Sequence, residues 1–196
     1  MTMEHEIRGG VRPAEIRAED GAITVAGYAA VFGEEADIGG MFREVIAPGA
    51  FAAALTRGDD VTFLINHAGL PLARTRSGTL QLTEDDRGLR MTTELDPDDP
   101  DVRAIVPKMR RGDLDRMSFA FVATRQTWDE SREIPLRTIH EVRLFDVSIV
   151  TEPAYDGTEI GLRGLRAARG AQAMADAAIA RAAARMRMRL RLCTLR

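Results

Sequence analysis

The segment Phe63–Thr75 reads FLINHAGLPLART and changes character halfway along. It begins as an apolar run typical of a buried strand, and then meets Asn66-His67 and a turn that contains Gly and Pro. A strand that ends in this way presents its histidine at a loop. The chain has only three histidines. His67 is therefore either a structural residue or one half of an active site.

Strand and turn patterns surround this segment on both sides. Period-two alternation and β-branched or aromatic residues predict strands, Pro48 can open a short helix, and the acidic loop before residue 101 suits a helix start. The expected strands are 22–32, 42–46, 61–65, 117–124 and one or two within 137–150, with a hairpin at 79–95 and short helices at 48–55 and 101–111. These elements indicate an α+β, mainly β domain, either a β-barrel or a compact β-sheet, with helical inserts.

Charge divides the chain into unlike parts. Residues 163–196 hold nine arginines and one acid, a charge of +8, which leaves −11 for residues 1–162 because the total is −3. Alanine and arginine favour helix up to residue 184, whereas 185–192 alternate at period two. We therefore expect a flexible N-terminus (1–20), a folded domain (21–162) and a basic helical tail (163–196).

Several classes of function are excluded by composition. A single cysteine, Cys193, permits no internal disulfide and no multi-cysteine metal site, and no histidine has a second histidine or cysteine at metal-binding spacing. No glycine-rich loop has phosphate-binding spacing, so we expect neither metal nor cofactor. No apolar run approaches the ~20 residues of a membrane span. The N-terminus also lacks the apolar core of a secretory signal, and a cytoplasmic protein is expected.

Nucleophilic catalysis remains, and it requires a hydroxyl, a histidine and a group that orients the histidine. Ser118 lies between Met117 and Phe119, at the start of an apolar strand and just after a polar turn. Its hydroxyl is well placed to be fixed and partly desolvated. His67 and Ser118 are the best candidate pair. The alternative interpretation is a strand serine that faces solvent and a structural histidine.

Six short motifs follow one another along most of the chain. They are GYAAVF (27–32), FREVIAPGAF (42–51), LINH (64–67), LART (72–75), MSFAF (117–121) and LFDVSIVTEPAY (144–155). In this order they resemble the prohead (procapsid) maturation protease family of tailed bacteriophages. The resemblance covers residues 22–163.

The resemblance implies an assemblin-like fold, a β-barrel with surrounding helices similar to that of herpesvirus assemblins, and a serine endopeptidase. Ser118 in MSFAF corresponds to the nucleophile, and His67 in LINH corresponds to the base. For the third member we prefer Glu141, on the strand where the herpesvirus enzymes place a second histidine, and Asp146 is the alternative. The two are five positions apart, so on a regular strand only one can point at His67.

The same resemblance implies a place of action and partners. The protease would be packed in the immature capsid, or prohead, of a phage or phage-like particle in the host cytoplasm. It would cleave the scaffolding segment of the major capsid protein and then itself, between Leu162 and Ala184, where the composition changes. We expect no membrane partner and, because the tail has no aromatic residue, no specific nucleic acid. Self-association is left open.

Two other functions fit the sequence. One is a non-catalytic capsid assembly or scaffold protein on the same fold. The other is an unrelated β-barrel binding module with a basic tail. Substitution of Ser118 separates these functions from a protease.

Overall fold

The computed structural model describes residues 5–19, 22–151 and 158–193. The chain divides into two compact units, residues 1–158 and 159–196. Within the described residues, the first unit is built mainly of strands with two short helices, and the second is one long helix. The expected α+β, mainly β class is confirmed.

The first unit carries the strands β1 to β11 and two of the three described helices. The strands are β1 (Glu6–Pro13), β2 (Glu15–Glu19), β3 (Ala22–Val31), β4 (Ala36–Ile38), β5 (Phe42–Ile46), β6 (Thr62–Ile65), β7 (Ala68–Arg74), β8 (Leu80–Glu84), β9 (Gly88–Leu95), β10 (Arg116–Asp129) and β11 (Leu136–Val150). The helices are α1 (Ala52–Arg57), α2 (Pro100–Arg111) and α3 (Thr158–Cys193).

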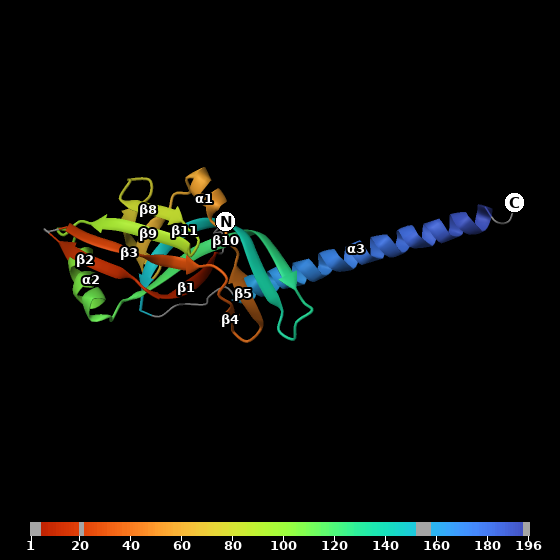
Figure 1. Cartoon of the computed structure of the whole chain (residues 1–196), viewed down its shortest axis with the longest axis horizontal. Helices are drawn as coiled ribbons and strands as arrows, with labels where there is room; N and C mark the ends of the chain where they lie inside the picture. The colour runs from red at the N-terminus through yellow and green to blue at the C-terminus, as the bar shows by residue number, and fades with distance from the viewer. Residues whose placement is uncertain (1–4, 20–21, 152–157, 194–196) are drawn as a thin grey trace. The chain divides into compact units, whose positions relative to one another are not determined.

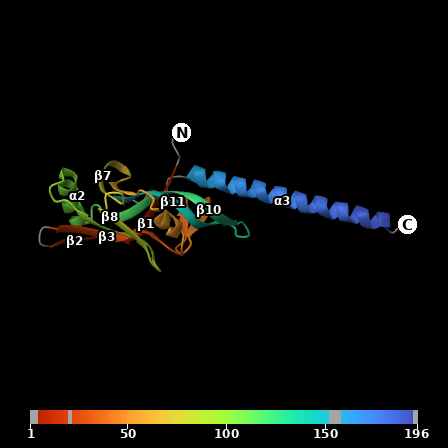
Figure 2. The ribbon, with the colours of Figure 1, turned by 90° about the horizontal axis from the view of Figure 1, so that it is seen from above.

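Two sheets hold the first unit together (Figures 1 and 2). One sheet has seven strands in the order β1-β10-β11-β5-β4, with β6 joined to β11 and β7 joined to β6. The other is antiparallel and has the order β2-β3-β9-β8. Among the described strands both sheets are open, so the expected closed, assemblin-like barrel is not confirmed.

The long strand β11 organises the larger sheet. It pairs with β10 along one edge, and on its other edge it pairs in parallel first with β5, at Leu136–Ile139, and then with β6, at Asp146–Ile149. At the β6 end, Ser118 of β10 lies opposite Ser148 of β11, which lies opposite Leu64 of β6. This row brings residues from three distant parts of the sequence side by side.

One apolar cluster joins the two sheets and the two short helices. Burying this surface is the main favourable term in folding, and it fixes the sheets against each other. The cluster includes Val25 and Met91 from the smaller sheet, Phe63, Phe119 and Val147 from the larger sheet, Ala54 from α1 and Val102 from α2.

Residues 5–19 differ from expectation. The described part of the segment that we expected to be flexible forms strands β1 and β2, which pair with β10 and β3. Backbone hydrogen bonds to an existing sheet can order a segment that has no hydrophobic alternation of its own. In β1, the charged side chains of Glu6 and Arg8 are buried and paired with each other.

Two helices also differ from expectation. Helix α1 begins at Ala52 rather than Pro48, because Gly49 has a positive φ of 86° that no helix accommodates. Helix α3 runs without a break through 185–192, since alanine, arginine, leucine and methionine all favour helix and their alternation has no described partner strand there. None of the described helices is both long enough and apolar enough to cross a membrane.

Asp59 ties the end of α1 to β11 and gives a stability prediction. Burial raises the pKa of Asp59, but hydrogen bonds from the Arg57 guanidinium and the Leu144 N–H outweigh burial and lower that pKa overall. A carboxyl whose pKa is lowered by folding stabilises the fold above its unfolded pKa, and this stability is lost as the pH falls through the folded pKa.

We expect Asp59→Asn to lower the free energy of unfolding at pH 7 by about 1–2 kcal/mol. Urea denaturation at a series of pH values measures this effect. The difference between wild type and variant should shrink below about pH 4, where the carboxyl of the unfolded chain is protonated. A difference that stays constant down to pH 3 would contradict this account.

Candidate active site

His67 sits at the tip of a tight hairpin. Strands β6 and β7 pair at Ile65 and Ala68, so Asn66 and His67 form a two-residue turn. Both have positive φ angles, 50° for Asn66 and 57° for His67, as a type I′ turn requires. Asparagine tolerates this left-handed conformation well. At His67 the same conformation is less favourable than it would be for glycine. The apolar run therefore ends where the chain must turn, and the imidazole is held at that tip.

The hairpin tip is fastened to β11 by hydrogen bonds. The Asn66 N–H donates to the Ile149 carbonyl at 3.0 Å, and the Thr151 N–H donates to Asn66 Oδ1 at 3.2 Å. The His67 N–H donates to Ser148 Oγ at 3.2 Å. These contacts fix the position of the His67 backbone relative to the strand that carries Asp146.

Ser118, His67 and Asp146 form a chain of hydrogen bonds. His67 Nε2 is 2.7 Å from Ser118 Oγ, and His67 Nδ1 is 2.6 Å from Asp146 Oδ1. A carboxylate only accepts hydrogen bonds, so the network assigns the ring hydrogen to Nδ1 and leaves Nε2 to accept the hydrogen of Ser118. This is the geometry in which an imidazole can take a proton from a hydroxyl.

Ser148 completes the surroundings of Asp146, and the sequence analysis did not assign it a role. Its hydroxyl donates to Asp146 Oδ1 at 2.8 Å and lies 3.2 Å from His67 Nδ1. Asp146 and Ser148 are two positions apart on β11, so both side chains lie on the face that carries Ser118. The spacing D-x-S within a strand opposite MSFAF was the signal available in the sequence.

Glu141, the preferred third member in the sequence analysis, is not placed at His67. Its carboxylate lies 3.6 Å from Arg57 Nη1 and 3.9 Å from Arg125 Nε, and its side chain is 34% exposed. Asp146 occupies the position beside the imidazole and is 6% exposed. The two acids are indeed separated, as their spacing requires, and the structure places the alternative residue at His67.

The other two histidines lie away from this group. His140 Nε2 is 2.8 Å from Thr127 Oγ1, and the His5 ring lies 5.6 Å from the ring of Phe145. Within the described part of the chain, no three His, Cys, Asp or Glu side chains are grouped so that they could hold a metal ion.

The N-terminal strand covers Ser118. The Ser118 side chain is fully buried, Gly9 of β1 lies opposite it, and Ser118 Oγ donates to the Arg8 carbonyl at 2.8 Å. The hydroxyl carries one hydrogen but has two acceptors at similar distances, Arg8 O and His67 Nε2. The site is thus assembled and occupied by the chain's own backbone.

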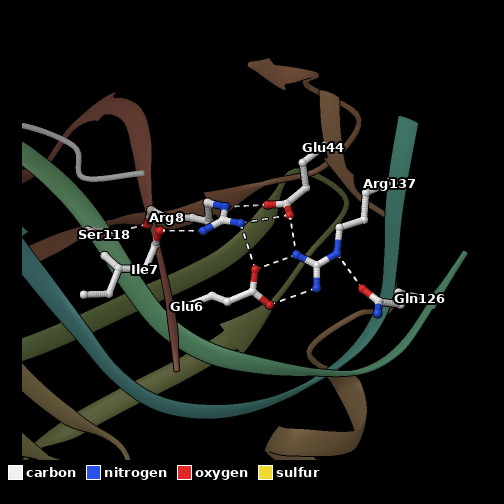
Figure 3. A network of polar contacts seen from close by, with 7 residues as sticks. All are labelled: Glu6, Ile7, Arg8, Glu44, Ser118, Gln126 and Arg137. Carbon is white, nitrogen blue, oxygen red and sulfur yellow. Dashed lines mark hydrogen bonds and ion pairs between the residues drawn. The ribbon is translucent and has the colours of Figure 1, made fainter. Parts of the chain in front are cut away.

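Arg8 belongs to a buried network of four charged side chains beside Ser118 (Figure 3). Glu44 of β5 accepts from Arg8 Nε at 2.6 Å and from Arg8 Nη2 at 3.1 Å. Arg137 of β11 donates to Glu44 at 2.8 Å and to Glu6 Oε1 at 2.8 Å. Burial lowers the pKa of Arg137, but its contacts with Glu6 and Glu44 outweigh burial and raise that pKa overall.

The positive φ of His67 predicts a difference between two substitutions that both remove the imidazole. We expect His67→Gly to be more stable than His67→Ala by about 1 kcal/mol, because only glycine adopts φ near 57° without a steric penalty. Thermal or urea denaturation of the two variants measures the difference. Equal stability would show that the turn relaxes when the imidazole is absent.

The chain matches a known protein family. Residues 12–175 match a family described as caudovirus prohead serine protease. The comparisons with curated proteins and with solved structures each return no significant match. The matched region includes β6, β10 and β11, which carry the hairpin tip, Ser118 and Asp146. Because it covers most of the sequence, the chain belongs to the caudovirus prohead serine protease family.

Proposed function

We propose that the chain is a serine endopeptidase in which Ser118 is the nucleophile, His67 is the general base and Asp146 orients the imidazole. Its substrates are the scaffolding segment of the major capsid protein and the chain itself. The observation that carries this proposal is the continuous set of contacts from Ser118 Oγ through the His67 ring to Asp146 Oδ1.

Family membership carries the general part of the function. The family consists of serine proteases of the prohead of tailed phages. A role in capsid maturation, interaction with capsid proteins and a location in the procapsid within the host cell follow from that description. The particular bonds that are cut and the residues that cut them are the part proposed here.

The proposed reaction begins when Ser118 Oγ attacks the carbonyl carbon of the scissile peptide bond. His67 Nε2 takes the hydroxyl proton as the new C–O bond forms. The C–N bond then breaks, and the proton on Nε2 passes to the leaving amine. A water molecule next attacks the acyl ester, His67 accepts its proton and returns it to Ser118, and the acid product leaves.

Asp146 and Ser148 support the base in this scheme. Asp146 Oδ1 accepts from Nδ1, keeps Nε2 toward Ser118 and stabilises the imidazolium that forms during the attack. Ser148 donates to the same carboxylate oxygen, so the carboxylate is held from a second direction. A base that is already oriented avoids reorganisation during the reaction.

Self-cleavage between residues 162 and 184 remains part of the proposal. This segment lies within α3, and most side chains of residues 164–183 are exposed. A protease site that holds its substrate as an extended strand requires the helix to unwind locally before cleavage. The exposed, alanine-rich helix has few side-chain contacts of its own within 164–183 that would oppose such unwinding.

Co-expression with the neighbouring capsid protein tests the function directly. We expect the wild-type chain to shorten the capsid protein, and Ser118→Ala and His67→Ala to leave it at full length. Intact mass spectrometry of the particles measures the result and locates the cut. Equal cleavage by all three chains would rule out this nucleophile and base. Particles that assemble without cleavage by any chain would favour the non-catalytic assembly protein.

A matched pair of substitutions tests the third member. We expect Asp146→Asn to lower kcat/KM by roughly 10³- to 10⁴-fold, since an amide at this position no longer holds the required tautomer of His67. Glu141→Gln, on the same strand but beside Arg57 and Arg125, should change kcat/KM by less than about twofold. A larger loss with Glu141→Gln than with Asp146→Asn would reverse the assignment.

A further inference from the structure

The position of β1 shows where an extended peptide would lie. Residues 6–9 pair antiparallel with residues 118–121 of β10, so that the Arg8 carbonyl reaches Ser118 Oγ. A peptide added to the edge of a sheet is a recurring mode of recognition, in which backbone hydrogen bonds supply affinity and side-chain pockets supply specificity. The Arg8 carbonyl lies against Ser118 Oγ, and the carbonyl of a scissile peptide bond must reach the same position.

The side chains of β1 enter a pocket that belongs to the rest of the domain. Glu6 and Arg8 are two positions apart and point to the same side, toward Glu44 and Arg137 (Figure 3). Glu44 receives two hydrogen bonds from the Arg8 guanidinium, and Arg137 donates to Glu6. The peptide bond that faces Ser118 follows Arg8. The domain thus binds the side chain before this bond with the carboxylate of Glu44, and the side chain two positions earlier, that of Glu6, with the guanidinium of Arg137.

We propose that β1 occupies the substrate-binding site, and that this site takes extended peptides with an acid two positions before an arginine, cut after the arginine. Glu44 is the residue that selects arginine, and Arg137 favours the acid. This inference rests on the proposed function, because it takes Ser118 as the nucleophile. The family match begins at residue 12, so the contact of Glu6 and Arg8 with the site lies before the matched region.

Burial makes the pocket selective. Glu6, Arg8, Glu44 and Arg137 are each at most 3% exposed. Charges taken out of water at such a site are tolerated only when each is paired. A peptide that replaces β1 without an arginine leaves Glu44 with a weaker set of partners, and one without the acid removes a partner of Arg137. The charge pattern of β1 is therefore the pattern that the emptied site requires.

The geometry also identifies β1 as a covering strand that, while it is tethered to the domain, stays short of the reacting position that a free peptide of the same sequence can reach. The Arg8 carbonyl competes with His67 Nε2 for the one hydrogen of Ser118, whereas the carbonyl of a reacting substrate accepts from separate donors that stabilise the oxyanion. While β1 is in place, Ser118 is fully buried and no other peptide bond can reach it. Substrate must therefore displace β1.

Two features make such displacement feasible. β1 is an edge strand with one neighbour in its sheet, and its register with β10 is interrupted between Gly9 and Pro13. A cavity of about 210 Å³ adjoins Arg8 and Gly9, and carboxylates of the chain gather around it. They come from Glu34, Glu35, Asp37 and Glu44.

The first experiment measures access to Ser118 in the full-length chain. A small fluorophosphonate, which reacts with activated serine hydroxyls, is added to wild type, Arg8→Ala, Arg17→Ala and Ser118→Ala. Arg17 is the matched control, because it also follows Glu-Ile but its ion pair with Glu15 is 72% and 71% exposed. We expect Arg8→Ala to react at least about tenfold faster than wild type, as a buried ion pair is lost, and Arg17→Ala to match wild type.

The outcomes separate this inference from the proposed function. Equal rates for wild type and Arg8→Ala, with no reaction in Ser118→Ala, would overturn the covering role of β1 and leave the nucleophile in place. A reaction that persists in Ser118→Ala would instead count against the nucleophile itself.

A second experiment does not depend on the folding of Arg8→Ala. The wild-type chain is given the peptide of residues 5–13, HEIRGGVRP, and the same peptide with alanine in place of its arginine at position 8. We expect kcat/KM to be at least about tenfold higher for the first peptide, with cleavage after that arginine. Equal hydrolysis of both peptides, or cleavage elsewhere, would overturn the assigned specificity.

The Glu44→Gln variant tests whether Glu44 selects arginine, because a purely structural role of Glu44 would leave the preference for arginine unchanged. We expect the preference for arginine over alanine to fall toward one, while fluorophosphonate labelling of Ser118 becomes faster because β1 is held less firmly. Glu35→Gln, which lines the same cavity and pairs with Arg132, should keep the wild-type preference. An unchanged preference in Glu44→Gln would remove Glu44 from the role of selecting residue.

Discussion

The parallel pairing of β6 with the end of β11 is the constraint on which the site depends. It sets the hairpin tip beside Ile149 and Ser148, and so brings the His67 ring within hydrogen-bond distance of Asp146 and Ser118. Ser118 arrives from the other edge of β11 through antiparallel pairing with Ser148. A shift of one residue in the register of either pairing would turn Asp146 or Ser118 to the opposite face of the sheet. The hydrogen bonds of both residues to His67 would then be lost.

The sequence allowed part of this arrangement to be predicted for clear physical reasons. His67 and Ser118 could be chosen because the first follows an apolar strand at a turn and the second begins an apolar strand just after a turn, and few other histidines and serines compete. Strand β5 was predicted with the bounds that the structure has, and the expected hairpin at 79–95 contains β8 and β9, since alternation along half-buried strands is a local property. The six motifs pointed to the family that the match then showed.

The rest depends on contacts between distant residues. To choose between Glu141 and Asp146, one must know which face of β11 contacts His67. That face is set by the pairing of β11 with β6 and β10. The order of β1 could not be predicted because Glu6 and Arg8 look like solvated charges until Glu44 and Arg137 are placed beside them. The role of Ser148 follows only once Asp146 is fixed.

The edge position of β1 has a consequence for timing. A segment tethered to its own binding site competes at an effective concentration of the order of millimolar, set by the short connecting chain. Dilute capsid protein in the host cell would rarely displace such a segment. If β1 covers the substrate site as proposed, capsid proteins crowded within one procapsid would reach comparable local concentrations and displace it only after assembly. Proteolysis would then be confined to a particle that is already built.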